Sequence, residues 1–300
     1  MADSMQSLKD QGGKEDRMSQ HALVLQSDFG LDDGAVNAMY GVAYSVDSSL
    51  RIFDLTHNIP VFHIWEASYR LLQSVSYWPE GTVFVSVVDP GVGSERRSVA
   101  VRTSSDQYII TPDNGTLTHI SRQNGIVEAR YLDEAQNRLP RSGESHTFHG
   151  RDIYAYTGAR LAAGILSFDR IGPEVSTDSI VKLPVMEAYI ENDWITGTID
   201  ILDIRFGNLW TNISRKLFKS LDVQYGDPVE VVIKQEDTKV YQQTMAFGRS
   251  FADMPVGKPV VYINSLDRLG IALNQGSFAK THHIGTGINW QISLQKSIQR

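Results

Sequence analysis

Three aspartates each follow a short apolar run that is typical of a buried strand. They are Asp28, Asp89 and Asp113. Ligands of open α/β sheets bind beyond the carboxyl ends of the strands, so carboxylates at three such ends favour a ligand site on one edge of a sheet. Aspartate is also a common turn former, above all before Pro-Gly as at Asp89. Each aspartate, considered alone, could therefore have a purely structural role.

One histidine stands just ahead of a predicted helix that begins near Arg151. His149 is followed by Gly150, and a glycine leaves room for a ligand to approach the backbone. An imidazole is mostly neutral near pH 7 and can accept a proton there. A single histidine is more often structural, so a functional role for His149 depends on the residues that the fold brings beside it.

The second half of the chain gathers aromatic, amide and carboxylate side chains within residues 203–212. An aromatic face such as that of Phe206 can stack on a heteroaromatic base, and the amide of Asn208 can donate and accept hydrogen bonds along the edge of that base. The segment therefore indicates a binding site for such a base. The alternative is a hairpin that buries Phe206 and Trp210 in a core.

Several familiar catalytic motifs are absent from the sequence. It has no GxxxxGK[ST] phosphate loop, no GxSxG nucleophile elbow and no HExxH zinc motif, and Gly91-Val92-Gly93 lacks the third glycine of a dinucleotide fingerprint. There is no cysteine, which excludes disulfides and thiolate sites. The carboxylates that accompany His149 lack the close spacing of a metal site, so no metal is expected. These carboxylates are Asp32, Asp33, Asp89 and Asp152.

The composition is that of an ordinary globular protein, with 300 residues of which 41% are hydrophobic and 21% charged. The net charge of −7 gives no support for a nucleic-acid partner, which needs concentrated Lys and Arg. No run approaches the roughly 18 apolar residues of a membrane span, so no membrane partner is expected. Residues 1–20 contain no apolar signal segment and are expected to form a flexible tail. The protein is expected to be cytoplasmic.

Two domains are expected to position the candidate site residues. Over residues 21–183, strand-like runs alternate with helical periodicity, which is typical of an α/β domain with a largely parallel sheet flanked by helices. Residues 190–300 are rich in short strands separated by turn-forming residues, which predicts an antiparallel β-barrel. The predicted strands are 22–25, 51–55, 82–88, 99–102 and 108–111, then 194–202, 229–234, 239–245, 259–264 and 270–273.

Taken together, the motifs resemble the S-adenosylmethionine hydroxide adenosyltransferase (SAM hydrolase) family, whose relatives include the fluorinase and the chlorinase. The resemblance covers about residues 22–280, in order and at family-like spacing. The matching segments are SDFGLDD (27–33), THNIP (56–60), FVSVVDPGVGSERR (84–97), TPDNG (111–115), TFHGRD (147–152), RFGNLWTNI (205–213) and YINSLDRLGIALNQG (262–276).

The resemblance implies hydrolysis of S-adenosyl-L-methionine to adenosine and L-methionine by attack of water on C5′, without a cofactor. By motif position, Asp89 would aim the water, Arg96 would fix Asp89 and help to hold the developing hydroxide, and His149 would take the proton. Halogenases of the family carry Tyr at the position of Asp89, Thr at Val92 and Ser at Gly150. At all three positions the chain is similar to the branch that uses water.

The resemblance further implies a homotrimer, with each active site between the first domain of one subunit and the second domain of its neighbour. In the first domain, Asp28 would hold the ribose diol, and Phe62 and Phe148 would pack against the substrate. Two positions depart from the family pattern. His63 stands where the family usually has Asp, and Leu266 stands where the halogenases have a carboxylate-binding Arg.

The second domain would supply the remaining contacts to this small-molecule substrate. Phe206 and Asn208 would hold adenine by stacking and by edge hydrogen bonds, and Phe251 would wall the pocket. Asp203 would take the methionine ammonium group, and Ser265 would take its carboxylate.

Three other functions are weighed against hydrolysis. The first is a halogenase-like adenosyltransferase on the same scaffold. The second is a non-catalytic sensor of adenosine or S-adenosylmethionine, against which the intact Asp89, Arg96 and His149 set argues. The third is a metal-dependent nucleotide hydrolase, which a chelator would inactivate.

Overall fold

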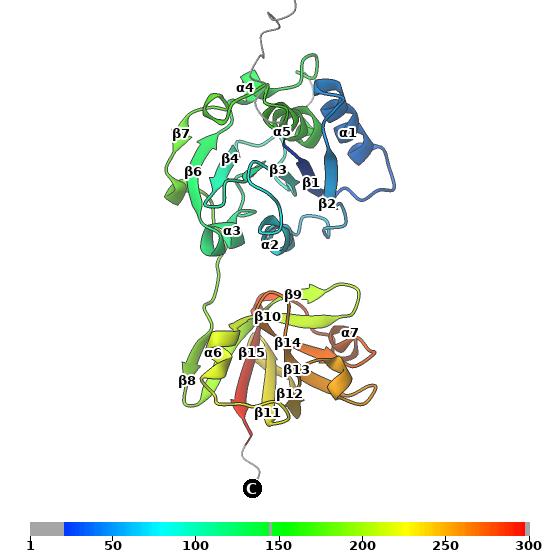
Figure 1. Cartoon of the computed structure of the whole chain (residues 1–300), viewed down its shortest axis with the longest axis vertical. Coiled ribbons are helices and arrows are strands. Elements are labelled where there is room, and N and C mark those ends of the chain that lie inside the picture. Colours follow the sequence, from blue (N-terminus) through cyan, green and yellow to red (C-terminus); the bar gives the residue numbers. More distant parts are fainter. Residues whose placement is uncertain (1–20, 144–145, 298–300) are drawn as a thin grey trace, which may run out of the picture. The chain divides into compact units, whose positions relative to one another are not determined.

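The computed structural model describes residues 21–143 and 146–297, and the predicted tail 1–20 lies outside them. The chain divides into two compact units, with the division between Lys182 and Leu183 (Figure 1). Each unit has its own hydrophobic core. Among the described residues, no helix is long and apolar enough to cross a membrane.

The first unit is built on a sheet with the strand order β2-β1-β3-β5-β4-β6-β7. Strands β2, β1, β3 and β5 run parallel to one another, and β4, β6 and β7 extend the sheet from β5 in antiparallel pairings. The strands are β1 (Leu23–Ser27), β2 (Ile52–Thr56), β3 (Val83–Val87), β4 (Ser98–Thr103), β5 (Tyr108–Pro112), β6 (Ile126–Tyr131) and β7 (Glu174–Val175). The predicted α/β fold is confirmed.

Helices cover both faces of this sheet, so its central strands are buried on both sides. Every residue of β3 is buried, as its unbroken apolar run predicts. Helix α1 and helix α5 pack on one face around Met39 and Leu25, while α2 and α3 pack on the other around Leu71 and Phe84. The helices are α1 (Ala35–Val46), α2 (Ile64–Val75), α3 (Thr118–Gln123), α4 (Glu134–Asn137) and α5 (Tyr156–Ala162), with a π-helical turn, Gly150–Ala155, directly before α5.

The second unit is a barrel in which seven of the eight strands of one sheet close on themselves. The order is β10-β14-β13-β12-β11-β15-β9, β9 pairs back with β10, and β8 extends from β9. The predicted antiparallel barrel is confirmed, with one parallel pairing between β12 and β13. Its strands are β8 (Tyr189–Glu191), β9 (Trp194–Asp203), β10 (Asn208–Ser214), β11 (Pro228–Gln235), β12 (Thr238–Phe247), β13 (Pro259–Ile263), β14 (Arg268–Leu273) and β15 (Gly287–Lys296); its helices are α6 (Arg215–Lys219) and α7 (Phe278–His282).

Candidate active site

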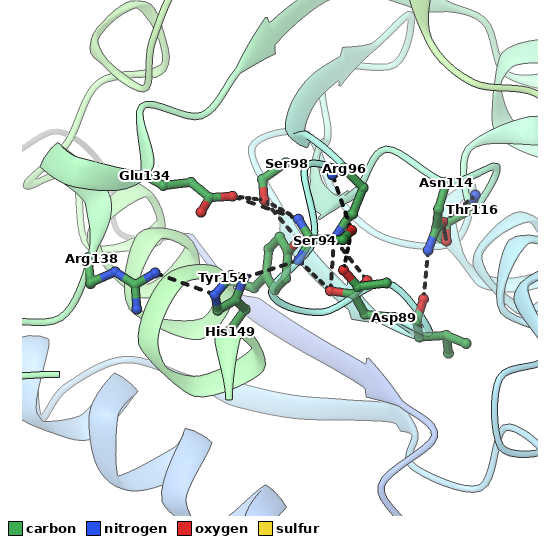
Figure 2. Close-up of polar contacts among 12 residues, drawn as sticks. Asp89, Ser94, Arg96, Ser98, Asn114, Thr116, Glu134, Arg138, His149 and Tyr154 are labelled. Carbon is green, nitrogen blue, oxygen red and sulfur yellow. Dashed lines mark hydrogen bonds and ion pairs between the residues drawn. The ribbon is translucent and has the colours of Figure 1, made fainter. Parts of the chain in front are cut away.

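Asp89, Arg96 and His149 lie in direct contact in the first unit (Figure 2). Asp89 follows β3, Arg96 precedes β4 and His149 precedes the π-helical turn. The Arg96 Nε lies 2.9 Å from Asp89 Oδ1 and 3.0 Å from Oδ2, and its Nη2 also donates to Oδ2. The same Nη2 lies 3.1 Å from His149 Nδ1. The fold thus joins the three predicted catalytic residues through one guanidinium.

The ion pair at the centre of this cluster is nearly withdrawn from solvent. The side chain of Asp89 is 5% exposed and that of Arg96 is 12% exposed. Burial acts to lower the pKa of Arg96, but the hydrogen bonds and charge of Asp89 outweigh it and the pKa is raised. Arg96 therefore stays a cation. Removing one partner of a buried pair costs about 3–5 kcal/mol, so each residue holds the other in place.

His149 is held in its neutral form. Burial lowers the pKa of the imidazole, and the positive charges of Arg96 and Arg138 act in the same direction. Arg138 Nη2 lies 3.4 Å from His149 Nε2, so both ring nitrogens face guanidinium groups, which can only donate. A neutral ring offers a single lone pair. We assign that lone pair to Nδ1, which has the shorter contact to Arg96, and the proton to Nε2. In this tautomer Arg138 makes no hydrogen bond to the ring.

A glycine-rich turn allows Arg96 to fold back onto Asp89. A Cβ atom at Gly91 would lie 3.2 Å from Arg96 Cγ and 3.2 Å from Ser94 Oγ. Gly93 adopts a φ of +77°, which disfavours residues with a side chain. Ser94 Oγ closes the turn by donating to the Gly91 carbonyl at 2.7 Å. Gly91 and Gly93 therefore favour a turn that brings Arg96 back against the Asp89 carboxylate.

Most of the site residues predicted for the first domain line one cavity of about 330 Å³. Arg96 lies behind Asp89 and is not among the lining residues. Most of the residues that line the cavity are apolar, and its charged or titratable groups are the carboxylates of Asp28 and Asp89 and the imidazole of His149. It is lined by Asp28, Phe29, Ala35, Val61, Phe62, Val87, Asp89, Val92, Thr147, Phe148, His149 and Gly150.

Phe62 is presented to the cavity by a strained backbone. Its φ is +67°, a region that costs a residue other than glycine about 1–3 kcal/mol, and its side chain is 66% exposed. The Phe62 backbone N–H donates to Asp28 Oδ2 at 2.9 Å, which holds this conformation. The next residue, His63, is the N-cap of α2 and accepts from the Glu66 backbone N–H at 3.2 Å. His63 therefore performs the capping role that suits the Asp usual in the family.

Asp113 does not share the cavity with Asp28 and Asp89, although it also follows a strand. Its Oδ1 accepts from the Val181 backbone N–H at 2.9 Å, and it is 8% exposed. Burial raises the pKa of this carboxyl. Asp113 is thus a structural residue, which was its alternative role. Among the described residues, no cluster of His, Asp or Glu could hold a metal ion.

The remaining predicted site residues lie in the barrel unit, which has a cavity of about 610 Å³ that Asp203 does not line. Phe206, Asn208 and Phe251 are among the lining residues. Asn208 is buried and its Nδ2 lies 3.5 Å from Asp203 Oδ2. Ser265 is exposed in the turn between β13 and β14 and is not among the residues that line this cavity.

The segment 203–212 is a hairpin, but the structure buries only one of its two aromatic side chains. Asp203 and Asn208 pair at the end of β9 and the start of β10. Trp210 is 8% exposed and donates from Nε1 to Tyr262 OH at 2.9 Å. Phe206 is 65% exposed, so the core-hairpin alternative fails for it. Phe206 and the buried Asn208 line the same cavity, and base binding by this segment stays a prediction.

Sequence reasoning missed the residues that support Arg96 from behind. Ser98, Glu134 and Tyr154 contact its guanidinium or one another (Figure 2). They come from β4, α4 and the π-helical turn. No motif or spacing in the sequence connects residues so far apart.

The chain matches the two domain profiles of one family. The sequence profile of the SAM hydroxide adenosyltransferase N-terminal domain matches residues 23–172, and that of the C-terminal domain matches residues 197–291. The chain belongs to this family.

Individual relatives and solved structures support the same membership. The (R)-S-adenosyl-L-methionine hydrolase of Salinispora tropica is 34% identical over 84% of this chain and 90% of its own length. A fluorinase of Actinopolyspora mzabensis is 29% identical over 93% of this chain and 99% of its own. The crystal structure of an uncharacterized conserved protein from Thermotoga maritima superposes with a TM-score of 0.83 at 31% identity, covering 91% of this chain and 100% of that one.

Proposed function

We propose that the protein hydrolyses S-adenosyl-L-methionine to adenosine and L-methionine. One observation carries the proposal: Asp89 and His149 line the same cavity as Asp28 and Phe62, and Arg96 binds the first two. Membership of the family and several relatives named (R)-S-adenosyl-L-methionine hydrolase support the same activity.

The reaction displaces a thioether from C5′ by water. The C5′–O bond forms, the C5′–S bond breaks with its electron pair returning to sulfur, and the proton that the water sheds as it bonds to C5′ passes to the Asp89 carboxylate and from there to solvent. Because the sulfonium already carries a positive charge, the leaving group needs no general acid. The difficulty lies with the nucleophile, because bulk water has a pKa of about 15.7. Holding the water in line with C5′–S can lower the barrier by about 7–11 kcal/mol, so positioning is the main requirement.

In the proposed mechanism, Asp89 is the direct partner of the attacking water. The Nε and Nη2 groups of Arg96 donate to Asp89 and His149, so the role of Arg96 in this mechanism is to fix Asp89 rather than to hold hydroxide. His149 keeps Arg96 in place, because its Nδ1 lone pair is engaged. No metal or cofactor enters the proposal, and turnover is expected to continue in a chelator.

The first unit binds the nucleoside side of the substrate in this proposal. Asp28 takes the ribose diol, while Phe62 and Phe148 place aromatic faces against the sulfonium. A cation over an aromatic face gains about 0.5–2 kcal/mol, and this attraction is absent for the neutral products. The binding pocket therefore favours substrate over product.

We also propose that the barrel residues complete the site of a neighbouring subunit in a homotrimer. Phe206 and Asn208 would hold adenine, Phe251 would wall the pocket, and Asp203 and Ser265 would bind the methionine end. Mixing Asp89→Ala, which is expected to be inactive, with Asn208→Ala, which is expected to bind weakly, tests this arrangement at substrate concentrations far below KM, where both variants are impaired. Subunits of the two variants that are dissociated and reassembled together should show more turnover than either variant alone, because some mixed sites contain both native residues. Recovery would be absent if each chain built its own site.

Isotope labelling tests the reaction itself. S-adenosyl-L-methionine is incubated with the protein in ¹⁸O-water, and mass spectrometry of the adenosine is expected to find the label in the 5′-hydroxyl. Parallel incubations with chloride or fluoride are expected to yield no 5′-halo-5′-deoxyadenosine. A halogenated product would establish the halogenase alternative, and tight adenosine binding without turnover would establish the sensor. The cytoplasmic location stays a prediction from the sequence.

A further inference from the structure

The side of Arg96 that faces away from Asp89 is held by a second carboxylate. Its Nη1 donates to Ser98 Oγ at 2.8 Å and lies 3.7 Å from Glu134 Oε1. With Nε and Nη2 directed to Asp89 and His149, every nitrogen of the guanidinium faces a named partner. A planar guanidinium donates in fixed directions. Contacts on Nη1 therefore also determine where Nε and Nη2 point.

The hydrogen bonds behind Arg96 run in one direction. Ser98 Oγ donates its only proton to Glu134 Oε1 at 2.6 Å, because the carboxylate cannot donate. The 2.9 Å contact between Ser98 Oγ and Tyr154 OH must then be donated by the tyrosine. Burial raises the pKa of the Tyr154 hydroxyl, so it stays protonated as a donor. The hydrogen-bond chain Tyr154 to Ser98 to Glu134 ends on a charge that attracts Arg96.

Glu134 is the first residue of α4, which is itself firmly anchored. Asp133 caps this short helix by accepting from the backbone N–H groups of Ala135 and Gln136 at 3.1 and 3.3 Å. Asn137, at its end, is 1% exposed and donates to the Asp133 and Ile171 carbonyls at 2.9 and 2.7 Å. The carboxylate of Glu134 therefore extends from a fixed backbone.

The residue that follows α4 contacts the other member of the catalytic cluster. Arg138 Nη2 lies 3.4 Å from His149 Nε2. Figure 2 shows Glu134 and Arg138 reaching toward Arg96 and His149 from the same short segment. The short helix α4 and the residue after it thus reach both Arg96 and His149, and the carboxylate of Glu134 is the group that attracts Arg96.

We propose that Glu134 is a positioning residue for the hydrolysis, which orients Arg96 and, through it, Asp89. The proposal rests on the proposed function. Glu134 does not line the cavity and has no contact with substrate in this scheme. Its loss should leave substrate binding intact and impair the alignment of the water, where a misplacement of about 1 Å can cost about 100-fold in rate.

The test compares kcat and KM for S-adenosyl-L-methionine in four variants. Glu134→Ala is expected to lower kcat about 10- to 100-fold with KM within about threefold of wild type. Glu134→Gln keeps an oxygen that accepts from Ser98 and is expected to retain more activity than Glu134→Ala. Glu128→Ala and Glu128→Gln are matched controls. Glu128 lies on β6, pairs with two arginines, Arg130 and Arg102, and does not line the cavity.

Titration of His149 by NMR gives a readout that a merely structural role would not move. The negative charge of Glu134 acts to raise the pKa of His149, so both Glu134 variants should titrate at lower pH than wild type, while both Glu128 variants should not. An unchanged titration, or an unchanged kcat in Glu134→Ala, would refute the proposal. So would a loss of turnover explained entirely by KM.

Failure of the two proposals can be told apart. If the wild-type protein does not hydrolyse S-adenosyl-L-methionine, the proposed function is wrong. The His149 titration still shows in that case whether Glu134 acts on the cluster. If the wild type is active and Glu134→Ala matches it, only the role of Glu134 is wrong. If Glu134→Ala does not fold, the kcat of Glu134→Gln and the titration of His149 in that variant decide whether Glu134 positions Arg96.

Discussion

The Nδ1 atom of His149 accepts a hydrogen bond from Nη2 of Arg96 at 3.1 Å. Because a guanidinium only donates, this contact leaves the ring proton on Nε2 and occupies the remaining lone pair. The imidazole is therefore not available to take a proton from water while the bond persists. This geometry favours a supporting role for His149 over the role of general base that the family resemblance suggests.

Substitution of His149 separates these two roles. Asn can offer its Oδ1 to Arg96 in place of Nδ1 but cannot act as a base. His149→Asn is expected to retain kcat within about tenfold of wild type, while His149→Phe, which offers no acceptor, should lose about 100-fold or more. Steady-state turnover of S-adenosyl-L-methionine measures both. Equal losses of kcat in the two variants would instead indicate that His149 acts as the general base.

Asp89→Ala is expected to abolish turnover and to retain adenosine binding. The variant removes the partner of the attacking water, but it leaves Asp28, Phe62 and Phe148 unchanged. Arg96 keeps Glu134 and Ser98 as partners, so the cluster is not left with an isolated buried charge. Calorimetry with adenosine, beside a turnover assay, checks both halves. Measurable turnover by this variant would remove Asp89 from the mechanism.

Asn208→Ala is expected to act chiefly on binding. Asn208 is buried beside Asp203 at the edge of the barrel cavity, and losing its hydrogen bonds to a base should cost about 1–3 kcal/mol, or about 5- to 150-fold in the Kd for adenosine. The kcat at saturating substrate should change much less. A normal Kd together with a lowered kcat would contradict the assignment.

Gly150→Ser is expected to destabilise the first unit. A Cβ at this position would lie 2.9 Å from two ring atoms of Phe29, and overpacking of this kind typically costs about 1–3 kcal/mol. Replacing Phe29 with Leu in the same chain should recover part of the loss, since the smaller side chain can move aside. Denaturant unfolding of both variants measures the difference. An additive loss in the double variant would show that the two positions are independent.

His119 is expected to make the protein sensitive to acid. Burial lowers the pKa of its imidazole to about 4, against about 6.5 in an unfolded chain. Between these values the unfolded state binds more protons, so stability rises with pH and is lost as the pH falls from about 6.5 toward 4. The loss from this one group between pH 7.5 and pH 5 amounts to about 2 kcal/mol.

Denaturant unfolding at the two pH values, in wild type and in His119→Phe, isolates this contribution. The ring of His119 packs edge-on against Trp65 and Tyr69, with centroids 4.6 and 5.2 Å away, so Phe is the closest apolar replacement. The variant should lose about 2 kcal/mol less stability than wild type over this interval. Parallel pH dependences would show that His119 does not carry the effect.

The strands that were predictable are those whose apolar pattern is local. Every residue of β3 is buried, and its unbroken apolar pattern alone predicts a strand. Strands β10 and β15 were not predicted, because β10 lies mostly within the segment 203–212, which is dominated by possible binding residues, and β15 mixes polar and apolar side chains along its length. Their pairing across the closed barrel, and not their own pattern, defines them.

The site was predictable only where a motif carries it. Asp89, Arg96 and His149 were found from segments that resemble a family, and the structure brings them into contact. Ser98 and Glu134 were not found, because their contact joins residues 36 positions apart through side chains alone. The exposure of Phe206 was likewise open, since the same hairpin sequence accommodates a core ring or a surface ring.

The π-helical turn Gly150–Ala155 sets how length changes can be tolerated near His149. Such a turn usually holds one more residue than the regular helix into which it can relax. Deleting one residue within Gly150–Ala155 would therefore let the segment relax into regular helix with little rotation of the chain upstream of it. Deleting one residue from the regular α5 helix, which has no extra residue to lose, would instead rotate everything upstream of the deletion by roughly 100° relative to the rest of the helix. The imidazole would then move away from Arg96 although no contacting side chain had been replaced, so such a deletion in α5 should be far more damaging to turnover than one in the π-helical turn.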